Sequence, residues 1–267
     1  MLPAELSEQI RAKSSFLCVG LDPDFQRLPR HLQSLPQADA IIAFNVGIIE
    51  ATQAYAVAYK PNLAFYEALG ADGHRVLQST LKAIPPHCFV IIDAKRGDIG
   101  NTARYYARAI WDMPGTDAIT VAPYMGEDSV TPFMETPEKW TFLLALTSNP
   151  GSADFQQLKV ASEPLYAAVI RKASEWAKAY PGPLGFVAGA THPEVLSQLR
   201  ALAPEAYFLV PGVGAQGGDL DAVCKALSPN VLINVGRQIL YASSGTDFIE
   251  AAAREAKQLQ QLMKPYF

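Results

Sequence analysis

Short apolar segments rich in branched side chains alternate with segments of helical periodicity, and this alternation limits the fold more than any other feature of the chain. Eight such segments are predicted strands: 16–20, 57–61, 89–92, 118–122, 141–146, 184–188, 206–210 and 231–235. The predicted helices between and after them include 38–55, 67–83, 164–179 and 246–263. Eight strand–helix units in 267 residues indicate an α/β protein with a single (β/α)₈ barrel domain over residues 1–267. A doubly wound open sheet would also alternate, and only the count of eight separates the two.

The composition excludes several classes of partner. The formal net charge is −4 with no long basic run, so neither nucleic acid nor an anionic membrane is an expected partner. No apolar run approaches the length of a membrane span, and the first 13 residues lack a signal-peptide pattern. Cys18, Cys88 and Cys224 are odd in number and lie in apolar surroundings, which is typical of reduced thiols. We therefore expect a cytoplasmic protein.

The stretch FVIIDAKRGDIGNT, residues 89–102, joins a buried strand to a group of charges. Residues 89–92 are apolar, whereas Asp93, Lys95 and Asp98 follow directly. Side chains alternate along a strand, so Asp93 and Lys95 are predicted to point to the same side. A surface turn with solvated charges is the alternative. The position of these charges at the end of a buried strand favours a functional site, because barrel active sites lie at the carboxyl ends of the strands.

Polar side chains also follow the other predicted strands. The candidates at the strand ends are Asp22, Lys60, Asp93, Lys95, Asp98, Ser148, Gln216 and Arg237. The two lysines neutralise the neighbouring carboxylates and repel a divalent cation, so we expect no metal at this site. The same carboxylates keep the lysines charged, which suits a proton donor and excludes a Schiff-base nucleophile. We see no site for an organic cofactor.

The last two predicted strands end in glycine-rich segments that suit a phosphate group. The segments are PGVGAQGGD, residues 211–219, and Gly236-Arg237. Glycines let backbone N–H groups approach an anion, and an arginine binds phosphate in a bidentate manner. In many barrels the loops after strands seven and eight hold a phosphate. The G-x-G-x-x-G pattern within 212–217 is not a dinucleotide fingerprint, because no acidic residue follows the next strand.

With these motifs in place, the chain resembles the orotidine 5′-phosphate decarboxylase family. The resemblance rests on DAKRGDIGNT, PGVGAQGGD and VGR, together with LDPD, the lysine of YKPN, and SNPG, and it spans nearly the whole chain. Many family members have Phe in place of Arg96, so the Lys-Arg-Gly-Asp form resembles one branch of the family. The segment 24–37 matches no family motif.

The resemblance implies a role for each residue. Lys95 is the catalytic proton donor to C6 of the pyrimidine, Asp93 lies beside the substrate carboxylate, and Lys60 orients Asp93. Asp22 and Lys60 bind the ribose hydroxyls. The remaining implied contacts are Ser148 or its neighbour Thr147 with the pyrimidine amide, Gln216, Gly236 and Arg237 with the 5′-phosphate, and Pro211 with the substrate. Catalytic Asp98, with Ile99 and Thr102, is implied to reach the partner subunit's site in a homodimer.

The implied reaction is the cofactor-independent decarboxylation of orotidine 5′-monophosphate (OMP) to UMP and CO₂ in pyrimidine biosynthesis. The C6 carbanion has no adjacent π acceptor, so preorganised charges near C6 must stabilise it. One rival is a metal-dependent barrel enzyme acting on a sugar phosphate, which EDTA would inactivate. A second rival is a nucleotide-binding module without catalysis, which would bind UMP tightly without turning over OMP.

Overall fold

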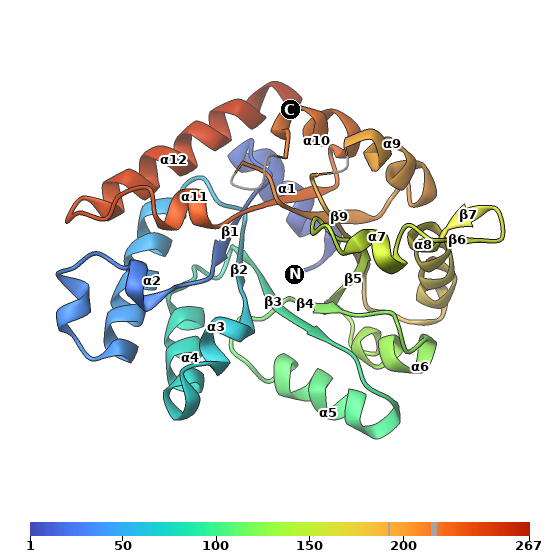
Figure 1. Ribbon diagram of the computed structural model, residues 1–267, viewed down its shortest axis with the longest axis horizontal. Helices are drawn as coiled ribbons and strands as arrows, with labels where there is room; N and C mark the ends of the chain where they lie inside the picture. The colour runs from blue at the N-terminus through green and yellow to red at the C-terminus, as the bar shows by residue number, and fades with distance from the viewer. Residues whose placement is uncertain (192, 215–217) are drawn as a thin grey trace.

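Eight parallel strands close into a barrel in the computed structural model, which describes residues 1–191, 193–214 and 218–267 (Figure 1). The barrel strands are β1 (Leu17–Leu21), β2 (Ala58–Pro61), β3 (Phe89–Arg96), β4 (Ala118–Val121), β5 (Trp140–Leu146), β8 (Leu184–Ala188), β9 (Tyr207–Pro211) and β10 (Val231–Val235). Strand β1 pairs with both β2 and β10, which closes the sheet. The predicted barrel is therefore confirmed, and the open sheet is excluded.

Helices surround the barrel on its outside (Figure 1). The α-helices are α1 (Pro3–Lys13), α2 (Gln37–Thr52), α3 (Leu63–Glu67), α4 (Gly73–Ala83), α5 (Gly100–Trp111), α6 (Glu127–Val130), α7 (Ser152–Phe155), α8 (Leu165–Trp176), α9 (Pro193–Leu202), α10 (Leu220–Leu227), α11 (Arg237–Leu240) and α12 (Phe248–Met263). The 3₁₀ turns are η1 (Phe25–Arg27), η2 (Leu32–Ser34), η3 (Gly70–Asp72), η4 (Thr131–Met134), η5 (Ala177–Ala179) and η6 (Lys264–Tyr266). No helix in the described ranges is long and apolar enough to cross a membrane.

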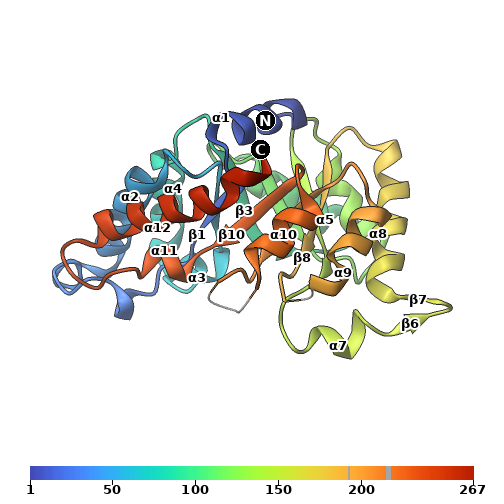
Figure 2. The same ribbon diagram turned by 90° about the horizontal axis from the view of Figure 1, so that it is seen from above.

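Aromatic side chains fill the amino-terminal end of the barrel. Phe89, Trp140 and Tyr207 are the first residues of their strands, and the ring of Trp140 lies 5.5 Å from Phe89 and 5.2 Å from Tyr207 between centroids. Helix α1 and both chain ends lie at one end of the molecule, whereas α7 and the hairpin of β6 (Lys159–Val160) and β7 (Glu163–Pro164) lie at the opposite end (Figure 2). Because large rings close the amino-terminal end, the space for a ligand is at the carboxyl ends of the strands.

Two local features differ from the expected elements. The helix expected over 67–83 is not continuous: α3 ends at Glu67, η3 follows, and α4 begins at Gly73, where a Cβ would lie 2.1 Å from the carbonyl oxygen of Tyr66. Only glycine permits this close approach, which turns the chain between the two helices. The helix expected from 164 to 179 begins one residue later, and an unpredicted hairpin of β6 (Lys159–Val160) and β7 (Glu163–Pro164) precedes it.

Candidate active site

The end of β3 departs from regular strand geometry where the charges begin. Ile92 pairs with Ile119 and Arg96 pairs with Val121, so four steps along β3 match two along β4. Within this bulge, Lys95 has a left-handed backbone with φ +47°. Such a conformation costs about 1 kcal/mol or more for a residue with a side chain, and it is typical of functional sites. The bulge places Lys95 on the same side as Asp93, as predicted.

The carboxylate of Asp93 is the centre of a network of charge-assisted hydrogen bonds. Its Oδ2 accepts from Nζ of Lys60 at 2.6 Å, and its Oδ1 accepts from Nζ of Lys95 at 2.6 Å. Thr120 Oγ1 also donates to Oδ1 at 2.9 Å, while accepting from the backbone N–H of Lys95 at 3.0 Å. The sequence did not reveal Thr120, because a threonine in an apolar strand also reads as an ordinary strand former. Its hydroxyl joins the carboxylate to the backbone of the bulge.

Burial and charge oppose each other at this centre, and charge prevails. Burial alone would raise the pKa of Asp93, but the ammonium groups of Lys60 and Lys95 outweigh it and hold the pKa well below its ordinary value. Burial alone would likewise lower the pKa of Lys60, yet Asp93 and Asp22 raise it to about 12. The centre therefore holds an ionised carboxylate between charged lysines.

A cavity of about 340 Å³ opens above this centre. Lys60, Asp93, Lys95 and Thr120 form its polar wall. The other lining residues are Leu144, Thr147, Ser148, Asn149, Val187, Leu209 and Pro211. A cavity of this size suits a small molecule with an apolar face and a charged edge. Pro211 and Ser148 therefore both lie on the wall of the cavity above Asp93.

Asp22 lies at the end of β1, beside the end of β10. A Cβ at Gly236 would lie 4.0 Å from Oδ2 of Asp22. Burial raises the pKa of Asp22, with Lys60 opposing the shift. Its buried Oδ1 has no hydrogen-bond partner within the described ranges. An unsatisfied carboxylate oxygen of this kind suits the hydroxyl of a ligand.

The glycine-rich segments lie next to this end of the site. Gly212 and Gly214 have φ of +96° and +72°, which a side chain would disfavour, and Gly218 N–H donates to the Gly212 carbonyl at 3.0 Å. Gly236 directly precedes α11, and Arg237, its first residue, is exposed. Within the described part of the chain, Arg237 forms no ion pair. Gln216 lies outside the described residues, so its predicted role stays a prediction.

In the described ranges, the residues expected to serve a partner subunit form no hydrogen bond or ion pair with Lys60, Asp93 or Lys95 of their own chain. Asp98 accepts the N–H of Ile99 at 2.8 Å and, in the described ranges, makes no ion pair with either lysine. Ile99 is 58% exposed, and Thr102 is also exposed. The structure therefore brings Lys60, Asp93 and Lys95 together in one chain and leaves Asp98, Ile99 and Thr102 on the surface.

Ser148 and Thr147 follow β5 and both line the cavity. The hydroxyl of Thr147 is held inside its own loop by Asn149 Oδ1 at 2.6 Å and by the side-chain amide of Gln156. The carbonyl of Ser148 accepts from Thr191 Oγ1 at 3.1 Å, which ties this loop to the end of β8. The loop is thus fixed over the cavity by bonds from both sides.

The fold and the site define the class: a (β/α)₈-barrel enzyme whose carboxyl-terminal mouth carries a lysine–aspartate–lysine centre beside glycine-rich segments suited to phosphate. Within residues 1–191, 193–214 and 218–267, no group of three His, Cys, Asp or Glu side chains is arranged to hold a metal ion.

Comparison with known proteins identifies the family. Residues 15–256 match the orotidine 5′-phosphate decarboxylase/HUMPS family. The orotidine 5′-phosphate decarboxylase of Christiangramia forsetii is 50% identical over 98% of this chain and 97% of its own length. A crystal structure of a putative orotidine-monophosphate decarboxylase from Toxoplasma gondii superposes with a TM-score of 0.86 at 35% identity, over 98% of both chains. The structure of Leishmania donovani UMP synthase gives a TM-score of 0.84 at 40% identity, over 97% of this chain and 57% of that one. The chain therefore belongs to the orotidine 5′-phosphate decarboxylase/HUMPS family.

Proposed function

We propose that the protein decarboxylates OMP to UMP and CO₂ in pyrimidine biosynthesis. The observation that carries the proposal is the ionised Asp93 between Lys60 and Lys95, at the mouth of a barrel of this family. Full-length relatives with 46–50% identity that are named orotidine 5′-phosphate decarboxylase support the choice of substrate.

In the proposed mechanism, OMP lies in the cavity with its carboxylate beside Asp93. The bond between C6 and the carboxylate carbon breaks, CO₂ leaves, and the electron pair remains on C6. Lys95 then transfers a proton from Nζ to C6, which gives UMP, and solvent reprotonates the half-exposed lysine. Asp93 disfavours the ground state by repelling the carboxylate, while Lys95 stabilises the developing negative charge.

The rest of the substrate binds at a distance from the reacting carbon. In this proposal Asp22 and Lys60 bind the ribose hydroxyls, Ser148 binds the pyrimidine amide, and the phosphate lies against Gly236 and Arg237, with Gln216 and Pro211 nearby. The unpaired Oδ1 of Asp22 and the exposed guanidinium of Arg237 support these assignments. Binding energy from such remote contacts can be expressed in the transition state.

A spectrophotometric assay tests the function directly. Purified protein in EDTA should convert OMP to UMP, followed as the loss of OMP absorbance. Activity that EDTA abolishes and a divalent metal restores would instead indicate the metal-dependent sugar-phosphate reaction. Tight binding of UMP without turnover of OMP would indicate a binding module.

We further propose a homodimer in which Asp98, Ile99 and Thr102 enter the partner's site. Exposed apolar side chains on α5 and in the segments before α5 and after β4 support this surface as the interface: Ile99 and Tyr105 are each 58% exposed, and Tyr124 is 88% exposed. Met125 belongs to the same surface, since a Cβ at Gly97 would lie 3.6 Å from its Cε. A two-fold dimer would give two equivalent composite sites.

Subunit mixing tests the shared site. Lys95→Ala and Asp98→Ala should each be nearly inactive alone. In a mixed dimer one site carries both substitutions, and the other receives Lys95 from one chain and Asp98 from its partner. Random pairing should therefore restore roughly a quarter of wild-type sites by two-fold symmetry. A mixture that stays inactive, despite subunit exchange proven with labelled chains, would show that Asp98 serves its own chain.

A further inference from the structure

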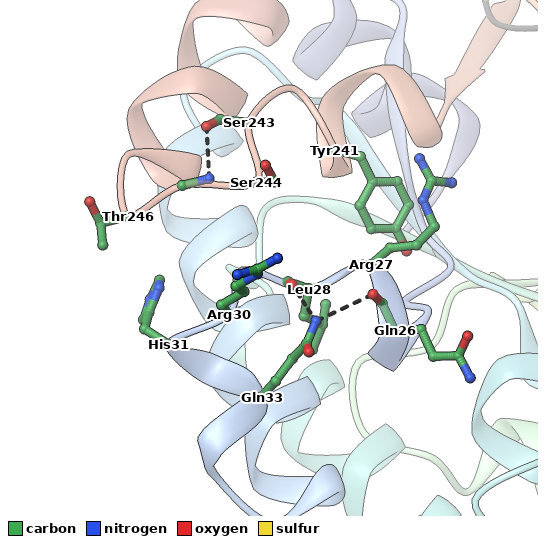
Figure 3. A pocket seen from close by; sticks show the side chains of 11 residues that line it. Gln26, Arg27, Leu28, Arg30, His31, Gln33, Tyr241, Ser243, Ser244 and Thr246 are labelled. Carbon is green, nitrogen blue, oxygen red and sulfur yellow. Dashed lines mark hydrogen bonds between the residues drawn. The ribbon is translucent and has the colours of Figure 1, made fainter.

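A second cleft lies outside the barrel mouth, between the segment that joins β1 to α2 and the loop that joins α11 to α12 (Figure 3). Its volume is about 820 Å³. Arg27, Arg30 and His31 form one wall, and Ser243, Ser244 and Thr246 form the facing loop. The basic wall belongs to the segment 24–37, which the decarboxylase motifs leave without a role. None of the residues assigned to the active site lines this cleft.

The arginines of this cleft lack acidic partners. No Asp or Glu is among the described residues that line it, and neither Arg27 nor Arg30 forms an ion pair within the described ranges. The adjacent Asp247 is already engaged, since it accepts from Ser243 Oγ at 2.6 Å and pairs with Arg254. The result is a local excess of positive charge in a chain with a net charge of −4.

The cleft has a basic side, which includes Arg30 and His31, and a facing loop that carries hydroxyl groups. Arg30 and His31 project from their segment toward the loop that carries Ser243, Ser244 and Thr246 (Figure 3). Guanidinium forks and hydroxyl groups are the donors that proteins use for phosphate. The volume lies within the range of small-molecule sites and is far larger than one phosphate requires. We propose that this cleft binds a small molecule through one or two phosphate groups, held by Arg30, with the hydroxyls of Ser244 and Thr246 on the facing loop as further donors.

One side chain separates this cleft from the substrate site. The guanidinium of Arg27 lies 3.7 Å above the ring of Tyr241. The hydroxyl of Tyr241 donates to the carbonyl of Asp22 at 3.2 Å and accepts the N–H of Asp24 at 2.7 Å. Because Tyr241 also follows α11, whose first residue is Arg237, a binding experiment must separate the two phosphate sites.

Calorimetric titration of the Arg237→Ala protein with inorganic pyrophosphate makes that separation, because it removes the arginine of the barrel mouth. One equivalent should still bind. Adding Arg30→Gln should weaken this binding about tenfold or more, since a charged hydrogen bond is lost. Arg171→Gln in the same background is the matched control: it removes an exposed arginine on α8 and should leave the affinity unchanged. Thermal melts of the three proteins confirm that each is folded.

The outcomes are separable from those of the catalytic proposal, because turnover of OMP is not measured. Absence of pyrophosphate binding in Arg237→Ala, or equal affinity with and without Arg30, would overturn the cleft assignment. Equal losses in Arg30→Gln and Arg171→Gln would also overturn it, since they would indicate nonspecific attraction. Titration with ADP and UDP identifies the source of the phosphate: tighter binding that depends on Arg30 indicates a nucleotide, and equal binding indicates recognition of the phosphate group alone.

Discussion

Two carboxylates at the barrel mouth, Asp93 and Asp22, differ in how the protein treats their charge. Asp93 is bonded by Lys60, Lys95 and Thr120, and its pKa is lowered despite burial. Asp22 is also largely buried, but its pKa is raised by burial, and one oxygen has no partner in the described structure. Asp93 is close enough to contribute to the raised pKa of Asp22, although burial is the larger cause.

This difference suggests that the proposed active site has two parts. The part around Asp93 would carry out the reaction, and the part around Asp22 and Arg237 would bind the rest of the substrate. The carboxylate of Asp93 is already bonded by Lys60, Lys95 and Thr120 before substrate binds, so these charged groups need little rearrangement when the substrate arrives. At Asp22 and Arg237 the charged groups have no ion-pair partners in the described ranges, so the bound substrate would satisfy them. If this division holds, substitutions at the Asp93 centre should lower kcat or stability, and substitutions at Asp22 and Arg237 should mainly weaken substrate binding.

Lys95→Ala should have the largest effect, because the proposed mechanism assigns to Lys95 both the proton transfer to C6 and the positive charge facing it. We expect kcat for OMP to fall by at least about a hundredfold, the usual contribution of a general acid, while UMP still binds through the other end. The measurement is kcat with a parallel titration of UMP. Lys172→Ala, at an exposed lysine on α8, is the control. A variant that kept more than about a tenth of wild-type kcat would refute the assignment of Lys95.

Asp93→Asn should have the next largest effect, here on stability. It removes the carboxylate bonded to the buried Lys60 and leaves only the charge of Asp22 nearby, and breaking a buried ion pair costs about 3 kcal/mol in the free energy of unfolding. The folded pKa of Asp93 is lowered, so its contribution is complete above the ordinary value of about 3.9 and is lost as the pH falls below it. Urea unfolding should therefore show a constant deficit near neutral pH that shrinks below about pH 4.

A matched change at the surface separates this effect from a general loss of charge. Asp39→Asn breaks the exposed pair with Arg75, and we expect a change of less than about 1 kcal/mol. If Asp93→Asn were no more destabilising than Asp39→Asn, the lysines would not depend on Asp93 for compensation, and the proposed division of the site would fail.

The sequence predicted the barrel and the Asp93 centre because both depend on short-range patterns. Apolar runs followed by charges place Asp93, Lys95 and Lys60 at strand ends, and barrel closure then brings them together. The bulge was not predictable, since the left-handed backbone of Lys95 depends on pairing with β4. Thr120 was missed for a related reason: its hydroxyl has a role only once β3 and β4 are adjacent.

The break between α3 and α4 also could not be predicted from the sequence. The close approach of Gly73 to the carbonyl of Tyr66 arises only after the chain folds back. The β6–β7 hairpin has two-residue strands with exposed or half-exposed side chains, too short for a period-two pattern. Features that depend on contacts between distant segments leave little trace in local composition.

Arg237→Ala should weaken the binding of the phosphate group without slowing the decarboxylation step itself. A charged hydrogen bond to phosphate is worth about 1.5–3 kcal/mol, so kcat/KM for OMP should fall by roughly tenfold to a hundredfold. Turnover of orotidine, which lacks the phosphate, should be nearly unchanged. Steady-state kinetics with both substrates makes the comparison, and Arg171→Ala serves as the control. Equal losses for the two substrates would mean that Arg237 supports the fold instead.

Asp22→Asn should give the smallest effect on stability, and its sign should be opposite to that of Asp93→Asn. The folded pKa of Asp22 is raised, so its carboxylate destabilises the fold increasingly as the pH rises from the ordinary value of about 3.9 through the folded pKa. Removing the charge should increase the free energy of unfolding by about 1 kcal/mol at neutral pH, and the gain should vanish below about pH 4. The KM for OMP should rise, because the amide replaces a charged acceptor with a neutral one.

For Asp22→Asn, the free energy of unfolding should rise while the affinity for OMP falls. Urea unfolding at neutral and acidic pH gives the first quantity, and steady-state kinetics gives the second. Asp72→Asn, at an exposed carboxylate on the molecular surface, should change neither by more than a small amount. A protein that loses stability on Asp22→Asn at neutral pH would show that Asp22 already has a stabilising partner in the free enzyme. In that case the two ends of the site would be organised alike, because each would satisfy its carboxylate before the substrate binds.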